Sequence, residues 1–434
     1  MTEYDASLAD ALGRAAHVLT GRPDDYDALM NRIADARIVL LGDPSHGTGE
    51  VYEQRARITR RLIEQHGFNA VAVDGDWPES YRVNRWLYGR SRDPNADAAL
   101  LDFRRFPSWV WRNDQVASFV TWLRSHNASI ADLRRRVGFY GLDLYSLNAS
   151  IESVLAYLDR VEPAAASEAR RRYAGLKGGA DEESPEPLDV SSTCEDHVAV
   201  LLTGRRLKRE EFLRRDGLVA LDEFFATELN AQLLGDADKH YRALLHGRSL
   251  VPTLHAAHLA DTLDALLAHL EWRSGRARVV VWAHNTQVGD RSVVTRGALG
   301  GTTLGGLLRE RHPDDAVLVG FTTYTGTVTA AAAWGGPEAS IPLPPAHGDS
   351  WELALHQTGA ALLYLDLKEA GAPFHELRPQ RAIGEVYQSD SDRHYFQVAL
   401  AKQFDAVIHC DRASAVTPLD VTVTAPGSEP RTPE

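Results

Sequence analysis

The sequence predicts an α/β fold with a mostly parallel central sheet flanked by helices. Seven short apolar runs, rich in Val, Ile, Phe and Tyr, have the length and composition of buried strands. Helical patterns lie between the first of them, and strands that alternate with helices form parallel sheets covered on both faces. One long interval, 161–272, has repeated helical patterns and almost no strand signal.

The predicted elements follow one another regularly before residue 160 and again after residue 272. The predicted strands are 37–42, 69–75, 136–142, 277–283, 315–322, 361–366 and 404–409. The helices predicted between the first strands are 51–66, 78–88, 113–125 and 147–160. Residues 1–160 and 273–415 are therefore assigned to one α/β core.

The interval 161–272 is interpreted as a helical insertion or cap on that core. Its predicted helices are 162–174, 193–213, 217–244 and 254–272. An acidic loop with two prolines, 181–187, interrupts them and is expected to be mobile. Residues 416–434 end in a stretch rich in Pro, Thr, Ser and Glu, which predicts a disordered tail.

The composition and net charge of the chain limit the classes of protein to which it can belong. The chain has 434 residues, 44% of them apolar and 25% charged, as in a globular protein with a large core. A net charge of −13 disfavours nucleic acid and anionic membranes as partners. Cys194 and Cys410 fit no disulfide framework, and no signal peptide or membrane-spanning run is recognised. We therefore expect a cytoplasmic location, with the oligomeric state left open.

Polar side chains follow five of the predicted strands. In an open α/β sheet, ligands bind in the crevice outside the carboxyl ends of the strands. The residues at those ends are, in chain order, Asp43 and His46, Asp74 and Asp76, Asp143 and Tyr145, His284 and Asn285, and Thr322, Thr323 and Tyr324. We expect them to line one crevice, although Asp143 serves equally well as a structural residue, because Asp and Asn after strands often cap helices.

His46 is the strongest candidate for chemistry, because its Ser-His-Gly-Thr turn offers little core for a histidine to fill. An imidazole with a pKa near neutrality suits a general base, and a nearby carboxylate such as Asp43 or Asp74 would orient it. Arg55, about two turns later, is expected to reach the crevice and bind a carboxylate or an oxyanion. No Gly-x-Ser-x-Gly motif is present, which favours attack by an activated water.

A metal site is the competing interpretation. A mixed oxygen and nitrogen ligand set is available from Asp43, His46, Asp74, Asp76 and His284. No compact ligand motif such as His-Glu-x-x-His accompanies it. We therefore expect no cofactor and keep a metal as the alternative.

Several motifs together resemble the erythromycin esterase family. They are LGDPSHGT at 41–48, VDGDWPE at 73–79, GFYGLD at 138–143, WAHN at 282–285 and GFTTYTGT at 320–327. Further matches are RRFP at 104–107, HYF at 394–396 and QFDAVIH at 403–409, and the resemblance covers about residues 30–415. It implies an α/β sheet whose helical part forms one wall of the active-site cleft. It also implies hydrolysis without a metal, with His46 activating water, Arg55 as the basic residue of the following helix and His284 as a supporting histidine.

The chain departs from the family pattern at four places. Asp43-Pro44 stands where the family typically has Glu-Ala, and Asp74 where it has a glutamate. Gln287 replaces a further histidine, and His255-Ala256 replaces an Arg-Asp pair. Displacing a catalytic group by 1 Å can lower a rate by about 100-fold, so these changes predict an altered catalytic site.

The resulting hypothesis is a hydrolase that acts on an ester or lactone of a hydrophobic, macrolide-like small molecule. Its predicted catalytic residues are His46, Asp43, Asp74, His284 and Arg55. Its predicted substrate-binding residues are Asp76, Asp143, Tyr145, Asn285, Gln287, Thr323, Tyr324, His258 and His394. The alternatives are a non-hydrolytic enzyme of secondary metabolism, catalysing dehydration, elimination or cyclisation, and a degenerate member that only binds its ligand.

Overall fold

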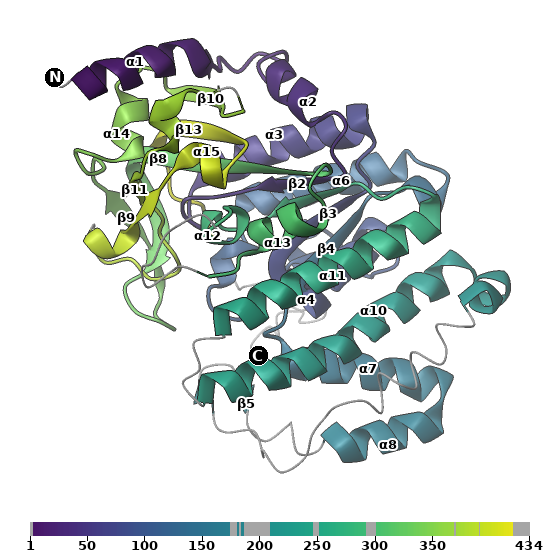
Figure 1. Ribbon diagram of the computed structural model, residues 1–434. Coiled ribbons are helices and arrows are strands. Elements are labelled where there is room, and N and C mark those ends of the chain that lie inside the picture. The colour runs from purple at the N-terminus through teal and green to yellow at the C-terminus, as the bar shows by residue number, and fades with distance from the viewer. Residues whose placement is uncertain are drawn as a thin grey trace, which may run out of the picture.

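A computed structural model describes residues 3–173, 180–181, 184–185, 209–245, 251–291, 301–368, 370–389 and 391–419. These residues form a nine-stranded, mostly parallel sheet between layers of helices, which confirms the predicted fold class (Figure 1). The strand order is β1-β10-β13-β8-β2-β7-β3-β4, and β9 pairs with β8. The bounds are β1 Ala16–Val18, β2 Ile38–Leu41, β3 Ala70–Asp76, β4 Gly138–Asp143, β7 Val279–Trp282, β8 Ala316–Ala331, β9 Glu338–Leu343, β10 Leu362–Asp366 and β13 Ala406–Ala413.

Six neighbouring strands, from β13 to β4, run parallel and carry the polar strand ends. In the centre, Leu41 of β2 lies opposite Trp282 of β7 on one side and Val319 of β8 on the other. The antiparallel strands β1, β10 and β9 lie outside this parallel part. The carboxyl ends of the parallel strands therefore meet at one edge of the sheet, as the sequence predicts.

All seven predicted strands are present, but β8 is about twice as long as its prediction of 315–322. Its parallel pairing with β13 ends at Gly326, and from there it forms a hairpin with β9. The other strands that the sequence does not predict are only two to four residues long. They are β1, the pair β11 Arg378–Arg381 and β12 Tyr395–Val398, and the pair β5 Ala180–Asp181 and β6 Ser184–Pro185.

The two faces of the sheet are covered by different helices, because side chains alternate along each strand. Val39 and Leu41 pack with α2, α3 and α6, while Ile38 and Leu40 pack toward α7, α10 and α11. The α-helix bounds are α1 Glu3–Ala15, α2 Asp27–Ile33, α3 Gly49–His66, α4 Trp77–Leu87, α5 Ala96–Ala99, α6 Asp114–Ala128, α7 Leu147–Val161, α8 Pro163–Tyr173, α10 Arg209–Leu245, α11 Val251–Ser274, α12 Asn285–Val288, α13 Leu304–Arg311, α14 Trp351–His356 and α15 Leu400–Gln403. The 3₁₀ helices are η1 Ser108–Val110, η2 Leu133–Arg135, η3 Ala372–His375 and η4 Asp392–His394.

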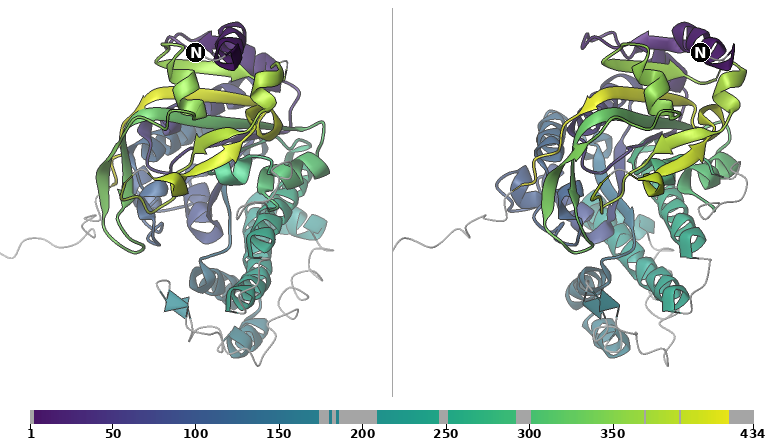
Figure 2. Two further views of the ribbon diagram at one scale, coloured as in Figure 1. Left: turned by 60° about the vertical axis from the view of Figure 1, so that its left-hand side comes forward. Right: turned by 90° about the vertical axis from the view of Figure 1, so that its left-hand side faces the viewer.

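Helices α7, α8, α10 and α11 form a group at the end of the molecule opposite α1 (Figures 1 and 2). Their apolar side chains, such as Phe224 and Leu263, share one hydrophobic core with Ile38 and Val279 of the sheet. Residues 193–208 of the predicted helix 193–213 lie outside the described residues, as do parts of the acidic loop 181–187. The division into an α/β core and a helical cap stays a prediction.

The ordered chain extends past the predicted start of the tail at residue 416. Val416 donates its backbone N–H to Gly47 O at 3.0 Å, and Leu419 donates to Arg112 O at 3.0 Å. Val416 is buried, since it packs against the core beside β2. The first residues of the predicted tail, 416–419, are therefore attached to the core, and residues 420–434 lie outside the described part of the chain.

Within the described residues, no helix combines the length and the apolarity that crossing a membrane requires.

Candidate active site

The turn after β2 is fixed by backbone hydrogen bonds to three other segments. Gly42 donates to Val319 O at 2.8 Å, and Asp43 O accepts the N–H of Asn285 at 2.8 Å. Pro44 O accepts the N–H of Ile383 at 2.7 Å. The turn is therefore positioned by β8, by the start of α12 and by the loop around Ile383 before any side chain is considered.

Gly47 follows His46 at a point where the backbone of β8 approaches closely. A Cβ atom at Gly47 would lie 1.9 Å from Thr329 O, so no side chain fits without moving β8. We expect Gly47→Ala to lower the free energy of unfolding by about 1–3 kcal/mol, because overpacking forces a backbone shift. Denaturant unfolding measures this, with Gly49→Ala as the control, since a Cβ there meets its nearest atoms at 3.4 Å. Equal stabilities of the two variants would contradict the close approach.

Asp43 and Arg55 form a buried ion pair at the centre of the turn. Asp43 Oδ2 lies 2.9 Å from Arg55 Nη2, and both side chains are 1% exposed. Burial by itself would raise the pKa of Asp43, but the charges of Arg55 and His46 hold this pKa well below its usual range. Asp43 is therefore a carboxylate at every pH at which the protein is expected to work.

Two of the three guanidinium nitrogens of Arg55 are occupied by protein groups, and the buried Nη1 has no hydrogen-bond partner among the described residues. Its Nε donates to Gly42 O at 2.9 Å, and its Nη2 donates to Leu41 O at 2.9 Å and to Ala283 O at 2.6 Å. The guanidinium connects the ends of β2 and β7 to Asp43. Arg55 is buried, and its Nε and Nη2 are held by this network, so the geometry favours a positioning role over contact with a substrate anion.

His46 lies beside Asp43 and remains partly open to solvent. Its Nδ1 is 3.5 Å from Asp43 Oδ2, and its side chain is 13% exposed. Burial would lower the pKa of His46, but the negative charges of Asp43, Asp74 and Glu385 raise it to about 9. Asp43 faces Nδ1, which leaves Nε2 as the ring nitrogen available for proton transfer.

His284 is held as a neutral imidazole with both ring nitrogens engaged. Its Nδ1 accepts the N–H of Thr286 at 3.3 Å and lies 2.8 Å from Thr286 Oγ1. Because Ile383 O can only accept, the 3.1 Å contact of Nε2 with it places the proton on Nε2. Burial lowers the pKa of His284 to about 4, although the charge of Asp43 opposes the shift. Its ring packs against that of His46, with centroids 4.8 Å apart.

Asp74 completes this cluster from the end of β3. Its Oδ2 accepts the backbone N–H of His284 at 2.9 Å. Burial raises the pKa of Asp74 to about 6, against the opposing charge of His46. Asp74 is therefore the second carboxylate of the cluster, and it ionises within the physiological range of pH.

Glu385 is a charged neighbour that sequence reasoning missed. Its negative charge contributes to the raised pKa of His46. At His284 the same charge partly opposes the burial that lowers the pKa. Its segment is fixed on both sides, because Ile383 donates to Pro44 O and Ala331 donates to Glu385 O. Most of the other site residues are identified by their positions directly after strands of the parallel sheet. Glu385 does not follow such a strand, so this criterion could not identify it.

Of the five residues proposed as metal ligands, Asp43, His46, Asp74 and His284 lie together, and Asp76 does not join them. Asp76 instead pairs with Arg105 at 3.0 Å and accepts the backbone N–H groups of Tyr145 and Ser146. Among the described residues, no group of three or more His, Cys, Asp or Glu side chains is arranged to hold a metal ion. Metal dependence stays untested.

The other predicted binding residues occupy several different places. The side-chain amide of Asn285 donates to Phe321 O of β8 and accepts the N–H of Phe321. Asp143 and Tyr145 lie with His255 at the end of β4. Thr323 is buried, the Tyr324 ring stacks on His356, and Gln287 is half-buried in α12. His258 pairs with Asp236 between α10 and α11, and His394 packs against Tyr387. The structure therefore brings together Asp43, His46, Arg55, Asp74 and His284, and places the rest around or away from them.

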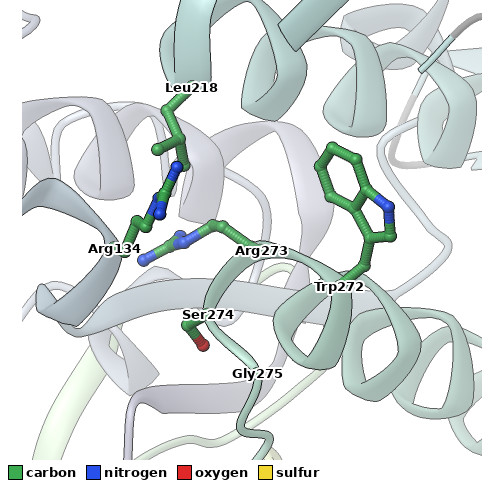
Figure 3. A pocket seen from close by; sticks show the side chains of 6 residues that line it. All are labelled: Arg134, Leu218, Trp272, Arg273, Ser274 and Gly275. Atoms are coloured by element: carbon green, nitrogen blue, oxygen red, sulfur yellow. The ribbon is translucent and has the colours of Figure 1, made fainter. Parts of the chain in front are cut away.

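A cavity of about 350 Å³ lies at the opposite edge of the sheet (Figure 3). Its lining residues are Arg134, Leu218, Trp272, Arg273, Ser274 and Gly275. They precede β4 and β7 or belong to α10, so the cavity is at the amino ends of those strands. None of the predicted site residues lines it.

Comparison with known proteins places the chain in a family. The sequence profile described as erythromycin esterase matches residues 63–413, a stretch that includes His284 and begins after the turn carrying His46. Erythromycin esterase type II of Escherichia coli is 21% identical over 413 residues, which cover 90% of this chain and 93% of that protein.

Two solved structures share the fold. A succinoglycan biosynthesis protein has a TM-score of 0.74 at 20% identity, with 96% of this chain and 99% of that chain covered. A mutant of the erythromycin esterase EreC in its open conformation has a TM-score of 0.61 at 17% identity, with 93% and 96% covered. The profile spans most of the sequence, and the chain therefore belongs to the erythromycin esterase family.

Proposed function

We propose that this protein hydrolyses an ester or lactone of a hydrophobic natural product, with His46 as the general base. Family membership suggests a hydrolase. The observation that supports the finer assignment is the buried Arg55–Asp43 ion pair beside the partly open ring of His46.

In this mechanism, Asp43 holds the Nδ1 side of His46 so that Nε2 takes a proton from the attacking water. Arg55 keeps Asp43 ionised and fixes its position through three backbone carbonyl groups. Because its nitrogens are engaged, His284 acts as a neutral support for the His46 ring rather than as a second base.

The pKa of His46 predicts an alkaline activity profile. Only the deprotonated imidazole is a base, and its fraction rises as pH increases through about 9. We expect kcat/KM for a macrolactone to increase about tenfold per pH unit below that value and to level off above it. Initial rates between pH 5 and 10 measure this, with enzyme stability checked at each pH. A plateau that begins near pH 6 would instead assign the base to Asp74, whose pKa is about 6.

The product distinguishes hydrolysis from the alternatives. Mass spectrometry after incubation with erythromycin A should show a product heavier by one water. A product lighter by one water, or an isomer, would favour elimination or cyclisation, for which the cationic His46 beside the carboxylate of Asp74 supplies an acid and a base. Tight binding without any product would identify a ligand-binding member of the family.

A further inference from the structure

A pair of aromatic rings lies at the tip of the β8–β9 hairpin, and the mechanism above does not use it. Trp334 is 62% exposed, although its ring packs against that of Phe106 with the centroids 4.9 Å apart. The tip is a tight turn in which Gly336 donates its N–H to Ala333 O at 3.0 Å. Gly335, inside this turn, has a φ of 71°, which favours glycine. Trp334 therefore lies at the corner of a turn with most of its ring open to solvent.

Phe106 belongs to a segment that runs along the carboxyl ends of the parallel strands. Its neighbour Arg105 pairs at 3.0 Å with Asp76, the last residue of β3. Trp111, five residues after Phe106, packs on Gly75 of β3, because a Cβ atom at Gly75 would lie 2.7 Å from Trp111 Nε1. This segment therefore lies over the end of β3, at the edge of the sheet that carries the candidate active site.

The same segment is attached to the turn that carries His46. Tyr52 Oη lies 2.9 Å from His46 O and 2.8 Å from Val110 O, so one hydroxyl group connects the two backbones. Within the segment, the Phe106 ring packs edge-on against the buried ring of Trp109, with the centroids 5.3 Å apart. Phe106 is therefore held in place beside the crevice by the core of the protein.

The hairpin reaches the His46 turn from the other direction. Thr329 of β8 donates its backbone N–H to Gly47 O at 3.1 Å. An extended chain advances at most about 3.6 Å per residue, so Trp334 lies within about 18 Å of this contact. The aromatic pair is thus connected to the same turn on both of its sides.

The hairpin tip offers apolar surface without charge. Residues 330–337 have the sequence AAAAWGGP, and Ala332 and Ala333 are exposed together with Trp334. The strand ends nearby carry carboxylates, histidines and arginines instead. Exposed apolar surface beside a charged crevice suits a ligand that has one reacting polar group and a large apolar remainder.

We propose that Trp334 and Phe106 form an aromatic rim that binds an apolar ring or chain of the substrate while its ester lies at His46. Aromatic side chains bury a large apolar area on contact with such a group. The inference rests on the proposed function and adds a size requirement to it. A bulky apolar ester or lactone reaches from His46 to the hairpin tip, whereas a short alkyl ester does not.

The test measures binding separately from turnover, in a His46→Gln background of the full chain. Calorimetry at several temperatures gives Kd and the heat-capacity change for erythromycin A. We expect Trp334→Ala to raise Kd about tenfold and to make the heat-capacity change less negative, because less apolar surface is buried on binding. Trp334→Phe keeps an aromatic ring and should raise Kd no more than about threefold.

Trp272→Ala is the matched control. Trp272 is also exposed, at 37%, but it lines the cavity at the opposite edge of the sheet. Its Kd for erythromycin A should equal that of the background protein. Phe106→Leu tests the buried half of the rim, and the variants of the exposed Trp334 keep the test decisive if Phe106→Leu fails to fold.

An unchanged Kd in Trp334→Ala, the same effect in Trp272→Ala or no binding of erythromycin A would overturn the rim. A Trp334→Ala variant that loses only self-association, measured by sedimentation, would also overturn it and assign the tip to a contact between copies of this chain. Turnover by the wild type with a Kd independent of Trp334 would contradict only the rim. The expected dependence on Trp334 without turnover by the wild type would contradict only the hydrolysis.

Discussion

Replacing His46 by glutamine should reduce kcat by about 10²–10⁴-fold, the usual contribution of a general base. The side chain has one close polar neighbour, Asp43, at 3.5 Å, and Asp43 keeps its ion pair with Arg55 when the imidazole is removed. The free energy of unfolding should fall at neutral pH, because the raised pKa of His46 means that folding stabilises its cation, and this loss should disappear as pH rises through about 9. Activity on a macrolactone and denaturant unfolding, measured on the same preparation, separate the two effects.

His356→Gln is the matched control for this variant. His356 also pairs with an aspartate, Asp411 at 2.6 Å, but it is more exposed and stacks on Tyr324 of β8. Its kcat should stay within about threefold of the wild type. If the His46→Gln variant kept its activity, His46 would not be the general base, and Asp74 would be the next candidate.

The elements predicted correctly are those whose sequences show one clear pattern, a short continuous run of apolar residues. β2, β3 and β7 are short runs buried on both faces, so their apolar residues alone identify them. The part of β8 after Thr325 could not be predicted from an apolar run, because Thr327 and Thr329 interrupt it and it pairs with β9. β11 and β12 have only four residues each, too few for a recognisable pattern, and they pair with each other.

The cluster around His46 could be predicted because most of its members follow strand ends directly. Asp43, Asp74 and His284 are brought together by topology, which the alternation of strands and helices already implies. The partners of these residues could not be predicted in the same way. Arg55 binds backbone carbonyl groups that any sequence possesses, and Glu385 reaches the cluster from a loop whose position depends on contacts with Pro44 and Ala331.

Removing Arg55 should be the most damaging change to stability. Arg55→Met leaves the carboxylate of Asp43 buried without its cation and removes the donor for three carbonyl oxygens. Breaking a buried ion pair from one side lowers the free energy of unfolding by about 3–5 kcal/mol. The double variant Arg55→Met/Asp43→Asn has no stranded charge, so it should lose less than the single variant, and the two changes should be non-additive.

The pH dependence of this loss identifies its cause. In the wild type, Arg55 lowers the pKa of Asp43, and the stability gained is present above the unfolded pKa and lost as pH falls. In Arg55→Met, burial without the cation raises the pKa of Asp43, so the variant regains stability as pH falls and Asp43 is protonated. The deficit should therefore be larger at pH 8 than at pH 5.

If the loss of stability does not depend on pH, its cause is the lost hydrogen bonds to the backbone carbonyl groups and not the charge of Asp43. Arg57→Met supplies the comparison on the same helix. Arg57 pairs with Glu53 at 2.7 Å, but the side chains are 44% and 53% exposed. Its loss should stay within about 0.5 kcal/mol, since exposed pairs of this kind contribute little. The contrast between Arg55 and Arg57 would show that burial of Asp43, rather than ion pairing as such, makes Arg55 indispensable to the turn that carries His46.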